Sequence, residues 1–281
     1  MVSHEDLIEV FEDTQKFYNE NETLKKSVAE SINGTKIYLE GESPSVGEKN
    51  FPETKISDGK YRTFETAQYY ARKFPNAKIA VLNFASATNP GGGVVHGSRA
   101  QEESLCRCST LYPVLATDEL WKKYYSFHRE NNDVRYTDAC IYTPNIFVIK
   151  SDESLPKRLP QEKWISVDVL TCAAPNLHKN PNNKYNPGEA KSMRVGDDEL
   201  LKIHKKRGKH ILSVAAHHKA EILILGAFGC GAFKNNPDVV AKAYAEIIPE
   251  FDGFFQKIAF AVYCPPGKKE NFLAFDKVLG K

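Results

Sequence analysis

The spacing of apolar and polar residues changes along this chain and predicts helices and strands in turn. Residues 4–32 carry apolar side chains at helical spacing, so two helices are expected there, followed by a turn at Asn33-Gly34. Residues 35–40 follow as a possible short strand, and residues 42–60 are polar and broken by proline and glycine. The first 60 residues are therefore expected to be mainly helical.

After residue 60, apolar runs alternate with segments of helical periodicity. Strands are expected at residues 78–87, 140–149, 164–174, 221–228 and 257–264, and helices at residues 61–74, 118–130, 197–220 and 235–248. Strands that alternate with helices predict a three-layer α/β sandwich around a central sheet. The long irregular segment 178–193 is a candidate for a loop lying over a site.

Composition and charge exclude several classes of protein. The chain has 281 residues, of which 41% are apolar and 26% charged, enough for a sizeable core in one large domain or in a core domain with an attached segment. A net charge of +2 gives no general case for nucleic-acid binding. The sequence has no apolar run of the roughly 20 residues that a bilayer requires. Its start is acidic and amphipathic rather than like a signal peptide, and its six cysteines suit a reduced, intracellular setting.

Two small motifs carry weak signals for metal binding. Cys106 and Cys108 form a C-x-C pair, but no second pair follows at zinc-ligand spacing, so thiols packed on a helix are the favoured interpretation. His217 and His218 end a basic helix, where a solvated helix end is favoured over a metal or acid–base site. No metal site is predicted.

The stretch NPGGGVVHGSRAQEE, residues 89–103, follows the first buried strand and precedes a helix. Ligands of open α/β sheets bind at the carboxyl ends of strands, and glycine lets the backbone approach a ligand closely. Ser98 stands three residues before Gln101, which is the spacing of a capping box, so a helix is expected to begin near Arg99. Its amino end would favour an anion.

A second glycine loop, GAFGCGAFKNNP, has the same placement after the strand at residues 221–228. Gly226, Gly229 and Gly231 would leave its amides free to bind a phosphate or diphosphate, while Asn236 and Pro237 suit the cap and first position of the next helix. Neither loop matches a common nucleotide-binding motif. Together the two loops predict a phosphate-containing ligand.

Glu102 and Glu103 are adjacent at the expected helix start. Neighbouring helical residues point about 100° apart, so the two acids cannot act on one bond in the same way. One alternative is an acid–base site in which one glutamate works on the bond and the other supports the substrate or the loop. The other is stabilisation of the helix's positive end, and spacing alone favours it.

The combination of GGG, a spacer of seven residues and QEE resembles the signature of the poly(ADP-ribose) glycohydrolases. The loop GCGAF, residues 229–233, resembles their diphosphate-binding loop, and the wider context is similar to the bacterial-type branch. The resemblance covers roughly residues 60–265. It implies an α/β/α macrodomain with a mixed central sheet, divided into an N-terminal helical extension at residues 1–60 and a catalytic domain at residues 61–281.

The resemblance also implies roles for individual residues. Glu103 would be the catalytic acid, Glu102 would contact ribose hydroxyls near the cleaved bond, and Gln101 would help to shape the loop. The other implied substrate-binding residues are Asn89 at the distal ribose, Gly91, Gly92 and Gly93 along that ribose and its phosphate, Gly229, Cys230, Gly231 and Ala232 around the diphosphate, and Phe233 against the distal ribose. Cys230 could also be reactive, although its small size near a phosphate explains it equally well. The implied chemistry needs neither metal nor cofactor.

The expected activity is hydrolysis of the ribose–ribose O-glycosidic bonds of poly(ADP-ribose), with release of ADP-ribose. The alternatives are a macrodomain that only binds ADP-ribose, a hydrolase that removes single ADP-ribose units from protein or DNA, and a generic nucleotide-binding α/β protein. The expected partner is ADP-ribose or its polymer attached to protein, with no nucleic-acid reading and no membrane. A monomer in the cytoplasm, or in the nucleus of a eukaryote, is expected.

Overall fold

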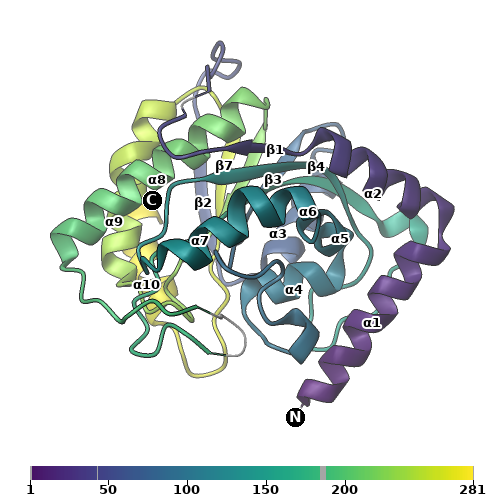
Figure 1. Ribbon diagram of the computed structural model, residues 1–281. Helices are drawn as coiled ribbons and strands as arrows, with labels where there is room; N and C mark the ends of the chain where they lie inside the picture. The colour runs from purple at the N-terminus through teal and green to yellow at the C-terminus, as the bar shows by residue number, and fades with distance from the viewer. Residues whose placement is uncertain (1, 43, 184–187, 281) are drawn as a thin grey trace.

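A computed structural model describes residues 2–42, 44–183 and 188–280. They form three layers, in which helices cover both faces of one central sheet (Figure 1). The strands are β1 Lys36–Tyr38, β2 Lys55–Gly59, β3 Ile79–Phe84, β4 Cys140–Val148, β5 Ile165–Cys172, β6 Ile222–Leu225 and β7 Lys257–Ala261. Their order is β1-β4-β5-β3-β6-β7-β2. Strand β4 pairs antiparallel with β1 and β5, and the other pairs are parallel, so the predicted mixed central sheet is confirmed.

The central strands are largely apolar because both of their faces are covered. In β3, Ala80 and Leu82 belong to the core on one side of the sheet, and Ile79 and Val81 to the core on the other. The first side is covered by α8 Asp197–His217, α9 Pro237–Ile247 and α10 Glu270–Leu279. The other side carries α1 His4–Glu20, α2 Glu22–Gly34, α3 Thr63–Lys73, α4 Gln101–Cys108 and α5 Leu111–Leu115.

The predicted helix at residues 118–130 is continuous but irregular. It comprises α6 Asp118–Leu120, a π-helical segment at Trp121–Tyr125 and α7 Ser126–Asn131. Tyr124 and Tyr125 are fully buried on the α4 side of the sheet. Short 3₁₀ turns occupy Val94–His96, Gln161–Lys163 and Ile248–Phe251.

Strand β2 and helix α10 are among the elements that have no counterpart in the sequence prediction. Strand β2 is an edge strand whose residues are all exposed or half-buried, so it carries no apolar pattern. Helix α10 follows a polar turn and buries Ala274, Phe275 and Leu279. Strands β1 and β2 belong to the central sheet, although both lie within the first 60 residues, and the division at residue 60 stays a prediction.

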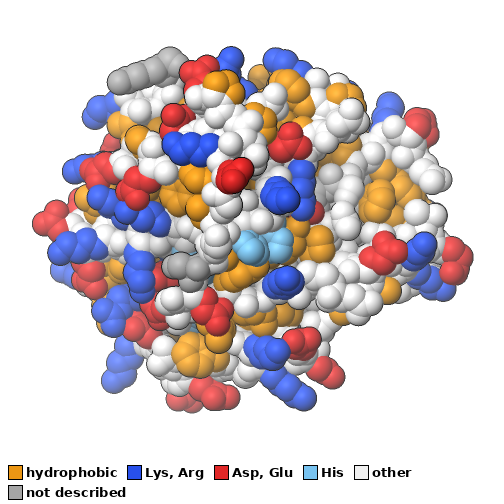
Figure 2. Space-filling model, turned by 90° about the horizontal axis from the view of Figure 1, so that it is seen from above, with side chains coloured by type: hydrophobic (Ala, Val, Ile, Leu, Met, Phe, Trp, Pro, Cys, Tyr) orange, Lys and Arg blue, Asp and Glu red, His pale blue; other side chains and the backbone are white. Residues whose placement is uncertain are grey.

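The helices in the described part of the chain include no candidate for a membrane span. None of the helices there combines the length and the apolar character that crossing a bilayer requires. On the face shown in Figure 2, basic and acidic side chains are interspersed, and apolar side chains gather only in small groups.

Candidate active site

The two glycine loops meet at one end of the sheet, because β3 and β6 are adjacent parallel strands and each loop follows one of them. They line a cleft of about 1000 Å³ together with the start of α4. Nine of the twelve residues to which the resemblance assigns a role line this cleft: Gly92, Gln101, Glu102, Glu103, Gly229, Cys230, Gly231, Ala232 and Phe233. Residues far apart in the sequence thus share one concave surface.

Glu102 is fixed against the end of β3. Only 2% of its surface is exposed. Its Oε2 accepts a hydrogen bond from the backbone N–H of Ser86 at 2.7 Å, and its Oε1 accepts one from Nδ2 of Asn83 at 3.3 Å. Asn83 also donates to Oγ1 of Thr171 on β5 at 3.2 Å. Glu102 therefore joins the start of α4 to the sheet.

Glu103 faces the first glycine loop and binds it through one of its two carboxyl oxygens. Its Oε1 accepts the backbone N–H of Gly93 at 2.9 Å. Its Oε2 is buried and has no hydrogen-bond partner among the described residues. An unpaired buried carboxyl oxygen is costly unless a ligand, water or proton satisfies it, which makes this oxygen a candidate for chemistry.

Position 92 requires glycine because the carboxyl groups of Glu102 and Glu103 leave no room there for a side chain. Its φ of +58° favours glycine, and an added Cβ would lie 2.5 Å from Oε1 of Glu103 and 3.1 Å from Oε2 of Glu102. A side chain at this position would displace both acids. The glycine therefore lets the loop close over the two carboxyl groups.

Both acids are held in a protonation-favouring environment. Burial raises the pKa of Glu102 well above its usual range, and the adjacent Glu103 raises it further. Burial also raises the pKa of Glu103, while the hydrogen bond from Gly93 and the charge of Arg107 oppose that rise. A carboxyl with a raised pKa can keep its proton near neutral pH and act as a general acid.

Asn89, Gly91 and Gly93 lie within the first loop and support it. Nδ2 of Asn89 donates to the carbonyl oxygen of Gly92. Arg129 contacts the same turn, with Nε donating to the carbonyl oxygen of Thr88 at 2.7 Å and NH2 to Oδ1 of Asn89 at 3.5 Å. The Asn89 side chain is thus bound to its own loop.

The start of α4 differs from the sequence prediction. The helix begins at Gln101 with Ala100 as its cap, so the predicted cap at Ser98 is wrong. Gly97 adopts a left-handed conformation, and the N–H of Ser98 donates to the carbonyl oxygen of Gly93, which keeps Ser98 inside the loop. The glycine loop is longer than the capping-box spacing implied.

Gln101 joins α4 to β3. Its Oε1 accepts the N–H of Phe84 at 2.8 Å, and its Nε2 donates to the carbonyl oxygen of Leu82 at 2.8 Å and to Oγ1 of Thr63 at 3.0 Å. These bonds hold the helix start beside the strand end. Gln101 thereby places the two acids that follow it.

The second loop is built around Asn235, which the sequence analysis missed. Its Nδ2 donates to the carbonyl oxygens of Pro175, Gly229 and Phe233, and its Oδ1 lies 2.7 Å from Nε2 of His204. Burial lowers the pKa of His204 to about 4, so this histidine is neutral at pH 7 and its Nε2–H is the donor. No sequence motif marked Asn235, because each of these contacts is to a backbone carbonyl oxygen or to a residue distant along the chain.

The glycines of the second loop differ in their surroundings. An added Cβ on Gly229 would lie 2.6 Å from Ala174, whereas one on Gly231 would meet nothing within 4 Å. Asn236 caps α9 and Pro237 is its first residue, as predicted. Phe233 is half-buried, with its ring centroid 6.2 Å from that of Tyr136.

The cleft continues to an aromatic and basic end that the sequence analysis also missed. Tyr263 follows β7, and the guanidinium of Arg62 lies 3.9 Å from the centre of its ring. Both residues line the cleft. Tyr263 lies two residues after the end of β7 and inside the strand expected at residues 257–264, so no separate sequence signal marked it.

The cysteines and the histidine pair singled out from the sequence show no sign of reactive or metal-binding chemistry in the described residues. Cys106 and Cys108 are free and fully buried on α4, and burial raises the pKa of the Cys230 thiol, which keeps it protonated. His218 stacks on Tyr142, and burial lowers the pKa of that histidine to about 4. No group of three potential metal-ligating side chains occurs in residues 2–42, 44–183 and 188–280.

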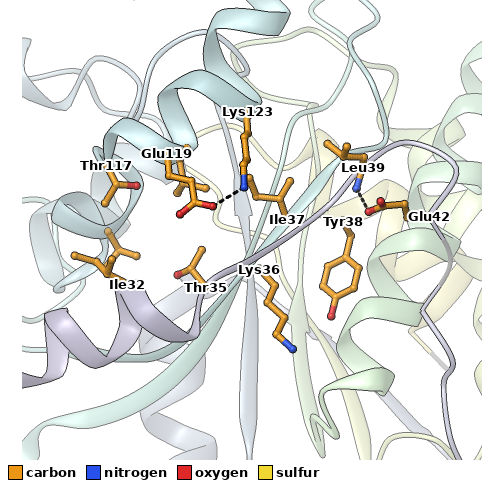
Figure 3. Close-up of a pocket in the computed structure, with 12 residues that line it drawn as sticks. Ile32, Thr35, Lys36, Ile37, Tyr38, Leu39, Glu42, Thr117, Glu119 and Lys123 are labelled. Atoms are coloured by element: carbon orange, nitrogen blue, oxygen red, sulfur yellow. Dashed lines mark hydrogen bonds and ion pairs between the residues drawn. The ribbon is translucent and has the colours of Figure 1, made fainter.

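A second cavity, of about 680 Å³, lies at the β1 edge of the sheet (Figure 3). It is lined by residues of α2, β1 and the segment 114–123, including the Lys123–Glu119 ion pair. It shares no lining residue with the cleft that holds the glutamates. Of the irregular segment 178–193, Asn183 lines the cleft, and residues 184–187 lie outside the described residues.

Comparisons with known proteins agree with this geometry. The family model for the microbial-type PARG catalytic domain matches residues 6–151. No curated protein sequence matches the chain.

Solved structures match over nearly the whole chain. The poly(ADP-ribose) glycohydrolase (PARG) of Thermomonospora curvata is 27% identical with a TM-score of 0.82, covering 97% of this chain and 99% of its own. The same enzyme bound to the inhibitor ADP-HPD is 28% identical with a TM-score of 0.78 over the same shares. The Deinococcus radiodurans enzyme in complex with ADP-ribose is 30% identical with a TM-score of 0.75, covering 90% of this chain and 96% of its own.

These matches cover the three-layer fold, so the predicted macrodomain architecture is confirmed. The family model spans both carboxyl groups and the first glycine loop. This chain therefore belongs to the family of microbial-type poly(ADP-ribose) glycohydrolase catalytic domains.

Proposed function

We infer that this chain hydrolyses the ribose–ribose O-glycosidic bonds of poly(ADP-ribose) and releases ADP-ribose, with Glu103 as the catalytic residue. The observation that carries the residue assignment is the buried carboxyl group of Glu103, whose Oε2 is unpartnered among the described residues and which lines the shared cleft. The T. curvata enzyme bound to ADP-HPD and the D. radiodurans enzyme in complex with ADP-ribose support a nucleotide-sugar ligand here.

The cleft offers a place for each part of ADP-ribose. The amides of residues 229 and 231–233 would bind the diphosphate, since Gly231 leaves open space beside the backbone, whereas the N–H of Cys230 already donates to the carbonyl oxygen of Ala227 at 3.1 Å. The distal ribose would lie between Phe233 and Gly92, next to the two acids. The Arg62–Tyr263 end would take the adenine, because a flat base stacks on aromatic and guanidinium surfaces.

The proposed reaction uses one carboxyl group twice. Protonated Glu103 donates its proton from Oε2 to the leaving ribose oxygen as the C–O bond breaks and the electron pair goes to that oxygen. The remaining ribosyl centre is oxocarbenium-like and is attacked by water. The ionised Glu103 then takes the proton of that water, which regenerates the acid. Glu102 has accepting capacity left for ribose hydroxyls.

A substrate panel tests the proposed activity. Purified protein is incubated separately with poly(ADP-ribose), mono-ADP-ribosylated protein, ADP-ribosylated DNA and a small O-acyl-ADP-ribose ester, and the release of ADP-ribose is measured. We expect release from the polymer at a rate at least about tenfold above the other three. Release from a mono-modified substrate alone would establish the alternative hydrolase, and binding of ADP-ribose without any release would establish a binding module.

Three expectations from the sequence accompany this proposal. The polymer is attached to protein, the chain works as a monomer inside the cell, and nucleic acid is not read directly. The interspersed charges in Figure 2 and the net charge of +2 support the last of these. Light scattering of the purified protein tests the monomer, and a shift of labelled single-stranded DNA at low salt would contradict the absence of nucleic-acid binding.

A further inference from the structure

The first glycine loop is joined to α4 at two points. At one, the N–H of Gly93 donates to Oε1 of Glu103 at 2.9 Å. At the other, NH1 of Arg107 donates to the carbonyl oxygen of Ser98 at 2.6 Å. Between them, the N–H of Ser98 donates to the carbonyl oxygen of Gly93 at 3.1 Å. These bonds form a closed circuit from Glu103 through the loop to Arg107, one helical turn farther along α4.

Arg107 is deeply buried for a charged residue. Only 2% of its surface is exposed, and its Nε has no hydrogen-bond partner among the described residues. Burying a guanidinium with an unused donor costs free energy of folding. We therefore expect Arg107 to have a role in the site that offsets this cost. Arg107 also lines the cleft that holds Glu103.

Helix α1 fixes Arg107 from the opposite side. Oγ1 of the fully buried Thr14 donates to the backbone carbonyl oxygen of Arg107 at 2.6 Å. Nearer the start of α1, Nδ1 of His4 lies 3.2 Å from the carbonyl oxygen of His96, and Arg99 donates to the carbonyl oxygen of Val2. The N-terminal helix therefore packs on both ends of the loop circuit, beside α4 (Figure 1).

We propose that Arg107 is a positioning residue, which holds the loop of residues 93–98 closed on α4 and so fixes the carboxyl group of Glu103 in the cleft. This inference rests on the proposed function of Glu103. It requires no contact between Arg107 and the substrate. Loss of the Ser98 contact would let the loop open and would free the Gly93 N–H from Glu103.

The charge of Arg107 supports the same role. Burial raises the pKa of Glu103, and the hydrogen bond from Gly93 and the positive charge of Arg107 oppose the rise. The other titratable or charged groups around Glu103 and its loop are Glu102 and Cys106 on α4, His96 and Arg99 in the loop, His4 on α1 and Tyr112 on α5. Removal of the Arg107 charge is therefore expected to raise the pKa of Glu103.

The test compares Arg107→Met with Lys150→Met. Lys150 is a matched control, because it is also a buried cation, with 1% of its surface exposed, and it binds α1 through the carbonyl oxygen of Val10 at 2.6 Å and Asp13 at 2.7 Å. Neither of those contacts involves the loop or Glu103. Both variants should lose thermal stability, because each loses a buried cation. A difference between them in activity or in the titration of Glu103 is therefore due to the specific role of Arg107 and not to a general loss of packing.

Three readouts are expected to distinguish the variants. In Arg107→Met, kcat for polymer hydrolysis falls by about tenfold to hundredfold, because small displacements of a catalytic group are costly. The loss of kcat/KM at high pH, assigned to deprotonation of Glu103, moves upward by at least about half a pH unit. The carbon-13 NMR titration of the Glu103 carboxyl, assigned with Glu103→Gln, moves in the same direction. Lys150→Met leaves all three at the wild-type values.

Two further variants cover the case in which Arg107→Met does not fold. Arg107→Lys keeps the charge and should leave the Glu103 titration within about 0.3 pH unit of wild type, whereas Arg107→Gln should raise it as Arg107→Met does. Equal titrations in Lys and Gln, or an equal shift in Lys150→Met, would overturn the inference. The NMR titration needs no turnover, so inactive wild-type protein would count against the proposed function alone and leave the role of Arg107 decided by the titration.

Discussion

The two glycine loops follow neighbouring strands, yet they are built for different tasks. In the first, the amide of Gly93 is occupied by Glu103, and the space beside Gly92 is filled by two carboxyl groups. In the second, Asn235 holds the loop from inside, and the space beside Gly231 is open. The first loop is closed on the acids, and the second is open toward the cleft.

This difference assigns the first loop to the catalytic step and the second loop to ligand binding. A loop whose amides already serve a carboxyl group controls that group's position and pKa, so changes there should affect kcat. A loop in which only part of the backbone amides donate within the protein, and in which the space beside Gly231 is open, can receive an anion, so changes there should affect KM and ligand affinity. Substitutions in the two loops can therefore break or sharpen the contrast.

Gly92→Ala should have the largest effect of the loop substitutions. The added Cβ would meet Glu103 at 2.5 Å, and the φ of +58° is unfavourable for alanine. We expect kcat to fall by about hundredfold, since the acids must move. Steady-state kinetics on the polymer check this, and a wild-type kcat would show that the loop does not fix the acids.

Asn235→Ala should act on the second loop. The variant removes three donations to carbonyl oxygens and leaves His204 without its partner. Unfolding free energy should fall by about 3 kcal/mol, because buried polar groups lose their hydrogen bonds. In protein that remains folded, calorimetry should show ADP-ribose affinity reduced by about tenfold. A larger effect on kcat than on affinity would contradict the division between the loops.

Glu103→Gln should stabilise the protein in a pH-dependent way. The pKa of Glu103 is raised in the folded state, so above 4.5, its usual value, the folded protein holds more protons at this site than the unfolded chain. The contribution of Glu103 to the stability of the wild-type protein therefore falls as pH rises from 4.5 through the pKa of Glu103 in the folded state. Glutamine at this position contributes no such pH dependence. The Tm difference between variant and wild type should be larger at pH 8 than at pH 4.5. An equal difference at both pH values would argue against a raised pKa.

Gly231→Ala should have the smallest effect and serves as the control for Gly92→Ala. Its Cβ would meet nothing within 4 Å in the protein. We expect Tm to remain close to wild type, kcat to stay unchanged and KM to rise by a few-fold where the methyl group approaches the diphosphate. A large fall in kcat would mean that the second loop also controls the acids.

The central strands and both glycine loops could be predicted from the sequence because their signals are local. β3 is apolar except for Asn83 because it is covered on both faces, and Asn236-Pro237 marks the start of α9. Strand β2 could not be predicted, since an edge strand with exposed or half-buried residues carries no apolar pattern. Ser98 had the right spacing for a cap, but the left-handed Gly97 extends the loop past it.

The supporting residues of the site could not be predicted for a different reason. Asn83, Arg107 and Asn235 act through contacts with Glu102, Ser98 and His204, which only the folded chain brings near. No spacing rule links such pairs. The doubled glutamate was visible in the sequence, but only burial and the Gly93 contact distinguish Glu103 from a helix-stabilising acid.

The most direct measurement of the central claim compares wild type and Glu103→Gln in two assays on the same preparation. Glutamine preserves the shape of the side chain and can still accept the N–H of Gly93, but it cannot donate a carboxyl proton. The account predicts that ADP-ribose binding by calorimetry stays within a few-fold of wild type, while release of ADP-ribose from the polymer falls by about a thousandfold. Hydrolysis at the wild-type rate, or loss of binding in parallel with hydrolysis, would contradict the account.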